Sequence, residues 1–343
     1  MYITWLYADF RNEWNTSYYR AVIPSILMER AGHKCYTTHI KEILTHNVLP
    51  ETQSAIDQSD VIVVERLLTK DAFDFIADMR VAGKKVFATF DDHYGLMPMG
   101  GSHTTWRGGK EALNGRGSIL NEFRAGLSLC DGFMTPSKLL CEDFAPYGTP
   151  YYVPNFLLDK LWENLPAKDP DNFVIGWGGS SAHSISFADS GIAPALGQIC
   201  KKYPKVYVHL QTYDPRITGL FDKFGVRYRS HNWVQFDIWP KIVATFHLGL
   251  APLAGEYDKR RSNLKTLEYG MVGVPWIATD DAPYQESAGG ILVKNKTKEW
   301  VRAIESLIND ASLYDSLSRH GKLWSHKFNE QCAKTYEGVL MNA

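Results

Sequence analysis

The chain has 343 residues, of which 45% are hydrophobic and 13% aromatic, and its formal net charge is −1. This length favours two domains, and the composition is typical of a globular protein with buried cores rather than a disordered chain. A near-neutral charge gives no global electrostatic argument for binding nucleic acid or an anionic membrane surface.

The sequence shows no membrane or export signal. No apolar run approaches the roughly 20 residues that a membrane-spanning helix needs. The first residues, 1–5, lack the basic and hydrophobic regions of a secretion signal. The five cysteines are dispersed and form no C-x-x-C pair, which is typical of reduced thiols in a cytosolic protein. We therefore expect a cytoplasmic protein with no transmembrane segment.

The first residues predict a strand–helix–strand unit. Residues 2–8 form an apolar strand, residues 17–31 a helix that ends at Gly32, and a second strand begins near Lys34. This order opens a Rossmann-like α/β unit. No G-x-G-x-x-G follows the first strand, which counts against a dinucleotide oxidoreductase. Arg20 on this helix is either a surface charge, which we favour, or a contact for an anionic group.

Polar side chains follow the next buried strands. Residues 60–65 and 85–90 are apolar, β-prone runs, and the second leads directly to Asp91, Asp92 and His93. Ligands of an open parallel sheet bind beyond the carboxyl ends of its strands, so these three residues are candidates for chemistry. The alternative is a capping or turn cluster, because Asp is common where strands end.

A long glycine-rich segment, residues 97–117, then interrupts the hydrophobic periodicity. Long loops inside compact domains tend to be functional or disordered. The segment carries basic and aromatic side chains, among them Trp106 and Arg107. These two residues are candidates for contacts with a ligand, with Trp106 stacking on a sugar or a base.

The middle of the chain predicts a linker and a second Rossmann-like unit. Residues 160–172 are polar and contain two prolines, which is typical of an interdomain linker. The strand over residues 173–177 leads to glycines, which let backbone N–H groups approach a phosphate without obstruction by a Cβ atom. A plain tight turn would have the same sequence. The candidate phosphate-binding residues are Gly178, Gly179, Ser180 and His183.

A second candidate site lies at the start of a later helix, for which Ser262 or Asn263 is the expected N-cap. Arg261, Lys265 and Glu268 have i, i+4 and i+7 spacing, which places them on or near one face. Two cations beside a helix N-terminus form an anion site, and a carboxylate one turn on can accept hydrogen bonds from sugar hydroxyls. The pattern suits a nucleoside diphosphate. The alternative is a solvated face with ion pairs worth a few tenths of a kcal/mol each.

The run from Arg261 to Gly270, followed by Gly273-Val274-Pro275, resembles the donor-binding segment of GT-B glycosyltransferases. The most similar group is the retaining family 4 and its relatives, and the resemblance is strongest over residues 246–317. It implies an α/β fold of two Rossmann-like domains that face each other across a cleft. By position, Lys265 then contacts the donor diphosphate and Glu268 binds the ribose.

The resemblance also implies a domain order. We expect an N-terminal acceptor-side domain over residues 1–158, a linker over 159–172, a donor-nucleotide domain over 173–322, and a C-terminal helix over 323–343 that crosses back to the first domain. One departure concerns the transferred sugar. Many members of the family have a second Glu that contacts this sugar, and the chain has Arg260 in its place.

The implied reaction is transfer of a sugar from a UDP- or GDP-sugar to a hydroxyl acceptor, with retention at the anomeric carbon. Positive groups would stabilise the diphosphate leaving group, and the residues after the strand 85–90 would position the acceptor or move its proton. The catalytic candidates are Asp91, Asp92, His93, Lys265 and Arg261; the donor-binding candidates are Gly178, Gly179, Ser180, His183, Lys265 and Glu268; the acceptor-side candidates are Arg20, Trp106 and Arg107.

The residues are compatible with more than one acceptor. The acceptor is a saccharide, a lipid-linked glycan or a hydroxylated nucleobase in DNA, and the net charge does not support the last. We expect no cofactor and no essential metal, since the adjacent Asp91 and Asp92 do not match the D-x-D spacing of metal-dependent transferases. The alternatives are a sugar-nucleotide epimerase and a non-catalytic nucleotide-sugar binding protein. The sequence leaves the oligomeric state undetermined.

Overall fold

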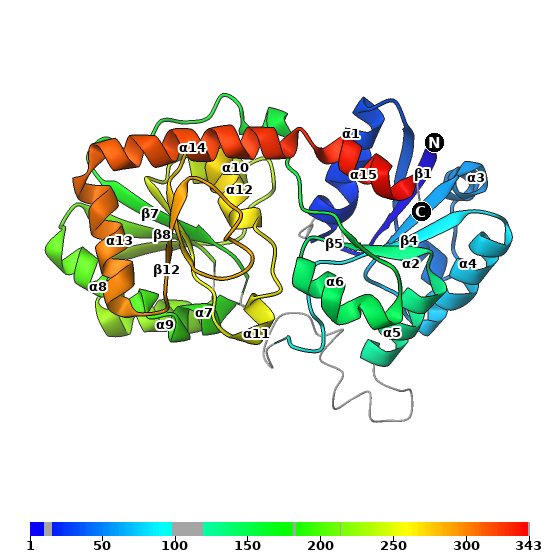
Figure 1. The fold of residues 1–343 in the computed structure, drawn as a ribbon, viewed down its shortest axis with the longest axis horizontal. Helices are drawn as coiled ribbons and strands as arrows, with labels where there is room; N and C mark the ends of the chain where they lie inside the picture. Colours follow the sequence, from blue (N-terminus) through cyan, green and yellow to red (C-terminus); the bar gives the residue numbers. More distant parts are fainter. Residues whose placement is uncertain (10–15, 98–118, 181–182, 213, 342–343) are drawn as a thin grey trace. The chain divides into compact units, whose positions relative to one another are not determined.

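A computed structural model of the chain describes residues 1–9, 16–97, 119–180, 183–212 and 214–341. Its residues group into two compact units. Each unit has one sheet with helices on both faces (Figure 1). The candidate residues Trp106 and Arg107 lie outside the described residues.

The N-terminal unit is built on a six-stranded parallel sheet in the order β2-β1-β3-β4-β5-β6. The strands are β1 (Tyr2–Tyr7), β2 (Lys34–His39), β3 (Val61–Glu65), β4 (Lys85–Thr89), β5 (Gly132–Thr135) and β6 (Pro150–Tyr152). Its helices are η1 (Tyr18–Val22), α1 (Ile23–Arg30), α2 (Lys41–Leu44), α3 (Pro50–Gln58), α4 (Lys70–Val81), α5 (Ile119–Leu129), α6 (Lys138–Phe144), η2 (Ala145–Tyr147) and α15 (Cys332–Leu340). Because all pairings are parallel, the carboxyl ends of the strands share one edge.

Apolar packing holds the end of β4 in place. All five residues of β3 are buried, as expected for a strand covered on both faces. The ring of Phe90, directly after β4, lies 5.0 Å from the ring of Phe123 and 5.1 Å from that of Phe144, between ring centroids. These edge-to-face contacts fix the backbone just before Asp91.

The second unit is a six-stranded parallel sheet in the order β12-β11-β10-β7-β8-β9. The strands are β7 (Phe173–Gly178), β8 (Val206–Gln211), β9 (Tyr228–His231), β10 (Leu248–Ala251), β11 (Trp276–Thr279) and β12 (Gly290–Val293). Its helices are η3 (Asp159–Trp162), α7 (Ser184–Asp189), α8 (Ile192–Lys202), α9 (Pro215–Phe224), α10 (Trp239–Ala244), α11 (Gly255–Asp258), α12 (Leu264–Met271), α13 (Thr297–Asn309) and α14 (Ala311–Asn329).

One aromatic side chain, that of Tyr269, packs helix α12 against β10. A Cβ atom on Gly249 would lie 2.5 Å from the ring of Tyr269, so only glycine lets the ring pack against this strand. The Tyr269 hydroxyl donates to the Leu250 carbonyl at 2.9 Å. Because β10 lies beside β7 in the sheet, this packing brings the start of α12 toward the end of β7.

The fold class expected from the sequence is confirmed: each unit is Rossmann-like, with parallel strands connected by helices. Two boundaries differ in detail from those expected. The first helix begins as a π-helix, η1, before α1. One continuous helix, α14, runs through residue 322, where we expected the donor domain to end. No helix among the described residues is long and apolar enough to cross a membrane.

Candidate functional site

Lys265 lies at the start of α12, where it meets the end of β7. Its Nζ donates a hydrogen bond to the carbonyl of Gly178, the last residue of β7, and lies 5.1 Å from the centre of the Trp177 ring. Burial lowers the pKa of Lys265 to about 8, and the negative charge of Glu268 acts in the opposite direction. The site therefore holds a largely desolvated ammonium group.

Arg261, just before α12, is held by Asp258. Its Nε donates to Asp258 Oδ1 at 2.9 Å, and its guanidinium lies 4.8 Å from the centre of the Tyr257 ring. Asp258 is buried, and its Oδ2 accepts bonds from Ser186 Oγ at 2.6 Å and from the Ala254 N–H at 2.9 Å. Asp258 was not predicted from the sequence, although its i, i+3 spacing to Arg261 indicates a contact between the two side chains.

His183 and Glu268 are both buried in this region. The pKa of His183 lies well below its ordinary value, first because of burial and then because of the positive charges of Arg261 and Lys265. The imidazole is therefore neutral near pH 7. Its Nδ1 has no hydrogen-bond partner among the described residues. A buried ring nitrogen without a partner is costly unless a ligand or water fills the position.

The N-terminus of α12 is not capped as we expected. Asn263 occupies the N-cap position, but no helix N–H bonds to its side chain, and its Oδ1 is buried without a partner among the described residues. The first N–H groups of an α-helix have no partner within the helix and carry its positive dipole end. An uncapped start beside Arg261 and Lys265 is suited to an anion.

Gly178, at the end of β7, and Gly179, directly after it, also have a packing role. A Cβ atom on Gly178 would lie 2.4 Å from the Trp239 ring, and one on Gly179 would lie 2.6 Å from the Trp177 ring. The N–H of Gly179 donates to the Gln211 carbonyl at 3.3 Å. The glycines thus admit two tryptophan rings, and the Gly179 N–H is engaged by β8. The neighbouring Ser180 accepts a bond from the His183 N–H through its carbonyl.

Arg260 lies beside the carboxylate of Glu256. Its Nη1 is 3.0 Å from Glu256 Oε2 and 2.9 Å from the Glu256 carbonyl oxygen. The Glu256 side chain is largely exposed. Arg260 thus forms an ion pair with a residue one helical turn earlier.

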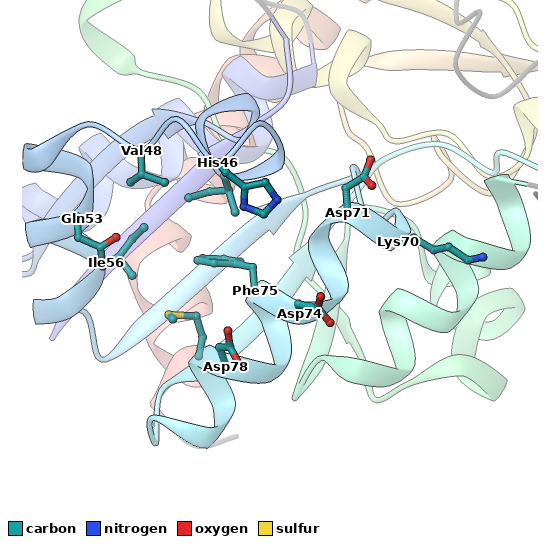
Figure 2. A pocket seen from close by; sticks show the side chains of 11 residues that line it. His46, Val48, Gln53, Ile56, Lys70, Asp71, Asp74, Phe75 and Asp78 are labelled. Carbon is teal, nitrogen blue, oxygen red and sulfur yellow. The ribbon is translucent and has the colours of Figure 1, made fainter.

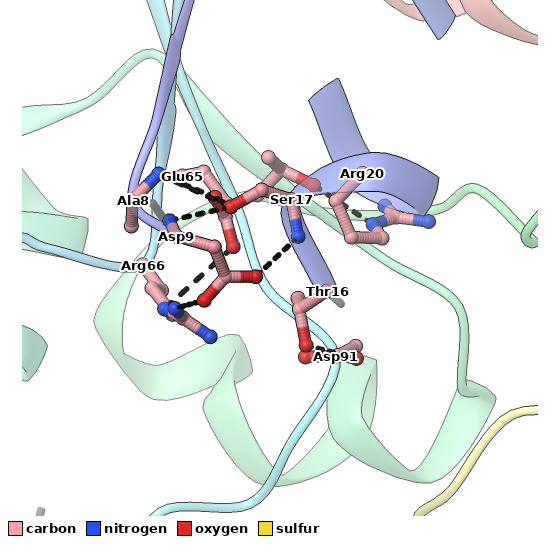
Figure 3. Close-up of polar contacts among 9 residues, drawn as sticks. Ala8, Asp9, Thr16, Ser17, Arg20, Glu65, Arg66 and Asp91 are labelled. Atoms are coloured by element: carbon pink, nitrogen blue, oxygen red, sulfur yellow. Dashed lines mark hydrogen bonds and ion pairs between the residues drawn. The ribbon is translucent and has the colours of Figure 1, made fainter. Parts of the chain in front are cut away.

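A second polar cluster lies at the carboxyl ends of β1, β3 and β4 in the N-terminal unit (Figure 3). Asp91 Oδ2 accepts a bond from Thr16 Oγ1 at 3.1 Å. Burial, and then the charge of Asp92, raises the pKa of Asp91 to about 7, against the effect of Arg66. Asp91 therefore exchanges its proton near neutral pH.

Four further residues of this cluster were not predicted from the sequence: Asp9, Ser17, Glu65 and Arg66. Glu65 Oε2 accepts bonds from Ser17 Oγ and from the Ala8 N–H, the latter at 2.7 Å. Arg66 bonds to Asp9 through Nη2 and lies 3.6 Å from Glu65 through Nε. Arg66 also has a φ of 44°, a left-handed conformation that non-glycine residues rarely adopt. Such strain clusters at functional sites.

Arg20 is not a surface charge, contrary to the interpretation we favoured. Its side chain is 0% exposed. Nε donates to Thr89 Oγ1 at 3.0 Å, and Nη1 donates to the Val153 carbonyl at 2.8 Å and to Asn155 Oδ1 at 3.1 Å. The periodicity of a helix does not show which face is buried. Only the structure shows that Arg20 connects η1 to β4 and to the segment after β6 through these hydrogen bonds.

His93, a further candidate from the sequence, lies beside Asp143 and Phe144. His93 Nε2 lies 3.7 Å from Asp143 Oδ2, and its ring packs 5.1 Å from that of Phe144. Among the described residues, no group of three or more His, Cys, Asp or Glu side chains is arranged to hold a metal ion. The structure thus gathers Arg261, Lys265, His183 and Glu268 in the second unit, and Asp91 with Arg20 in the first.

Comparison with solved structures gives full-length matches. HepE of Anabaena, solved in complex with UDP-glucose, matches with a TM-score of 0.64 at 15% identity, over 98% of this chain and 99% of that one. Sucrose-phosphate synthase from Thermosynechococcus elongatus matches with a TM-score of 0.64 at 13% identity, over 99% of both chains. The chain has the GT-B fold.

An epimerase shares this fold. UDP-GlcNAc 2-epimerase from Neisseria meningitidis, solved with UDP-GlcNAc, matches with a TM-score of 0.54 at 11% identity over the full length of both chains. No family model and no curated protein sequence matches the chain. Identities this low show the GT-B fold and leave the activity to be argued from the site.

Proposed function

We propose that the chain is a glycosyltransferase that moves a sugar from a nucleotide-diphosphate donor to a hydroxyl acceptor. The observation that carries the proposal is the meeting of Arg261 and Lys265 at the uncapped start of α12, beside the neutral, partner-free Nδ1 of His183. These groups form a site for a diphosphate. Glu268, one turn further along α12, supplies a carboxylate for the ribose hydroxyls.

The structural neighbours support a UDP-sugar as the donor. HepE was solved with UDP-glucose, with UDP and with UDP plus glucose. In the proposed transfer, the acceptor oxygen bonds to the anomeric carbon while the bond from that carbon to the diphosphate oxygen breaks. The electron pair of this bond leaves with the diphosphate. Arg261 and Lys265 stabilise the charge that develops there, and electrostatic stabilisation of this kind accounts for most of the rate enhancement in many enzymes.

We further propose that transfer retains the anomeric configuration and that Asp91 handles the acceptor proton. A carboxyl group with a pKa of about 7 is suited to proton transfer at neutral pH. Retention is tested by proton NMR of the product, where an inverted anomeric signal contradicts it. Loss of rate in Asp91→Asn at unchanged donor affinity supports the role of Asp91, and an unchanged rate rejects it.

We also propose that the reaction needs no essential metal ion, because the two cationic side chains supply positive charge at the leaving group. Treatment with a chelator, followed by assay with and without added Mg²⁺ or Mn²⁺, tests this point. An activity that disappears with the chelator and returns with the metal contradicts it.

The primary experiment is a thermal-shift titration of the purified protein with UDP, GDP, ADP, CMP and their sugars. A ligand at about 100 times its dissociation constant stabilises by roughly 2.7 kcal/mol. Lys265→Ala and Glu268→Ala are measured beside Lys201→Ala, an exposed lysine on α8. We expect one nucleotide to stabilise the native chain and Lys201→Ala, and to stabilise neither site variant. A shift that survives both site substitutions rejects the proposed donor site.

The fate of the donor separates this proposal from its two alternatives. A glycosyltransferase consumes the sugar nucleotide in an acceptor-dependent reaction. An epimerase converts the donor to its epimer without an acceptor, which NMR of the nucleotide sugar detects. A non-catalytic binding protein binds the donor and leaves it unchanged with every acceptor.

A further inference from the structure

A groove with both apolar and polar lining residues lies on the N-terminal unit and shares no lining residue with the carboxyl-edge cluster. It has a volume of about 350 Å³ and lies between α3 and α4, beside the segment after α2. Its apolar lining includes Ile56, Phe75 and Met79. Figure 2 shows the Phe75 ring inside the groove, with Ile56 facing it from α3. The groove is large enough to admit an aliphatic side chain.

One wall of the groove is acidic. Asp71, Asp74 and Asp78 line it from α4, at i, i+3 and i+7, and all three are exposed. Among the described residues, no side chain forms a salt bridge or a hydrogen bond with any of these three carboxylates. Like charges at i, i+4 destabilise a helix. The side chain of Lys70, the one lysine in the lining, points away from the Phe75 ring (Figure 2).

Helix α14 of the second unit carries an exposed apolar side chain with basic residues around it. Leu323 is 70% exposed, the most exposed leucine among the described residues. Arg319 and Lys327 lie one turn before and one turn after it, and Lys322 is adjacent. These positions surround a protruding aliphatic side chain with positive charge. Exposure of this side chain to water has a free-energy cost that burial against the apolar residues of the groove would remove.

The two patterns match in length. At about 1.5 Å per residue, Asp71 and Asp78 are about 10 Å apart along α4, and Arg319 and Lys327 are about 12 Å apart along α14. We propose that the chain associates with a second copy of itself: Leu323 of one copy enters the groove at Phe75 of the next, and the α14 cations face the α4 aspartates. The occupant of the groove is thus a segment that the chain itself carries.

This interface is heterologous, because two different surfaces meet. Such contacts propagate into chains or close into rings, rather than stopping at a symmetric dimer. It depends on exposed charges, so salt weakens it by shortening the screening length. It is independent of the donor site, and its test does not require activity.

The test begins with sedimentation velocity of the full chain over a range of protein concentrations. Salt is set at about 0.1 M and about 1 M, where the Debye length is about 10 Å and about 3 Å. We expect the weight-average sedimentation coefficient to rise with concentration at the lower salt and to rise much less at the higher. A coefficient that does not depend on concentration at the lower salt overturns the proposal.

Two variants then identify the surfaces. The groove variant is Asp74→Lys/Asp78→Lys, and the helix variant is Lys322→Ser/Leu323→Ser. Each is expected to be monomeric alone. An equimolar mixture is expected to form a 1:1 dimer and nothing larger, because the helix face of one variant and the groove of the other are both native. This rescue also shows that both variants are folded.

Two variants outside the proposed surfaces are the controls. Glu51→Lys on α3 lies outside the groove lining, and Lys298→Ser lies on α13, so both are expected to associate like the native chain. Association of either double variant alone at native strength, or a mixture that stays monomeric, rejects the proposed surfaces. A native chain that stays monomeric but binds phosphatidylserine vesicles through α14 rejects self-association in favour of a membrane contact.

Discussion

Lys265→Met separates a functional from a structural role, because the two roles predict opposite effects on the unliganded protein. Burial lowers the pKa of Lys265 from 10.5 to about 8, so its positive charge opposes folding. The folded state binds fewer protons than the unfolded state between these values. Stability due to this group therefore rises as the pH increases from about 8 to about 10.5, and the cost is fully present at pH 7.

The size of this cost follows from the pKa. At about 1.4 kcal/mol per pKa unit it is about 3 kcal/mol, and the partial exposure of the side chain reduces it to about 1 to 2 kcal/mol. Met keeps the length and apolar character of the side chain without the charge. Since 1 kcal/mol corresponds to about 2 to 4 °C for a unit of this size, we expect the unliganded variant to melt about 3 to 6 °C higher at pH 7.

Donor binding is expected to change in the opposite direction. A hydrogen bond to a charged group contributes about 1.5 to 3 kcal/mol, so loss of the ammonium weakens binding of the diphosphate by about 10- to 100-fold. Scanning calorimetry at pH 7 and pH 10, with and without UDP, measures both effects. The difference between the native chain and the variant is expected to shrink at pH 10, where Lys265 is neutral.

The matched control is Lys201→Met, an exposed lysine on α8, which is expected to change neither the melting temperature nor the ligand effect. If Lys265→Met lowers the unliganded melting temperature at pH 7, the bond from Lys265 to Gly178 holds the sheet to α12 and the reasoning from its buried charge is wrong.

Three further predictions concern Asp258, Asp91 and Arg20. Asp258→Asn removes the negative charge that holds Arg261, so steady-state assays are expected to show a decrease in kcat/KM of up to about 10-fold. An unchanged kcat/KM would mean that Arg261 does not contribute to catalysis. The pKa of Asp91 is raised to about 7, so native stability falls as the pH rises from about 4 to about 7; Asp91→Asn is expected to lose this slope in urea titrations. Arg20→Met leaves the Val153 carbonyl unpaired and is expected to destabilise by about 2 to 4 kcal/mol in urea, and Arg20→Lys by less; an unaffected Met variant contradicts this connecting role of Arg20.

The sequence was sufficient for the fold because several of the central strands are apolar runs. β3 is buried at every position, and such runs separated by helical segments predict a parallel sheet with few alternatives. The π-helical start at η1 was not predictable, since a π-helix differs from an α-helix by one inserted residue and leaves no distinct apolar pattern.

The site was predictable only where its residues are close in sequence. Lys265 and Glu268 share one helix, and their spacing shows that they are neighbours. Asp258 also depends on Ser186, which is 72 residues away, and Glu65 on the Ala8 N–H, 57 residues away. No local sequence pattern predicts hydrogen bonds between residues so far apart in the chain. Gly178 illustrates the same limit, because its lack of a Cβ atom serves the distant ring of Trp239.

The carboxyl edges of the two sheets hold different sets of ionisable side chains. In the second unit Arg261 and Lys265 meet there with a neutral His183, which favours an anionic ligand. In the first unit the corresponding edge holds Asp91 and Glu65, and burial raises the pKa of both. The proposed function therefore places the donor diphosphate beside Arg261 and Lys265 of the second unit.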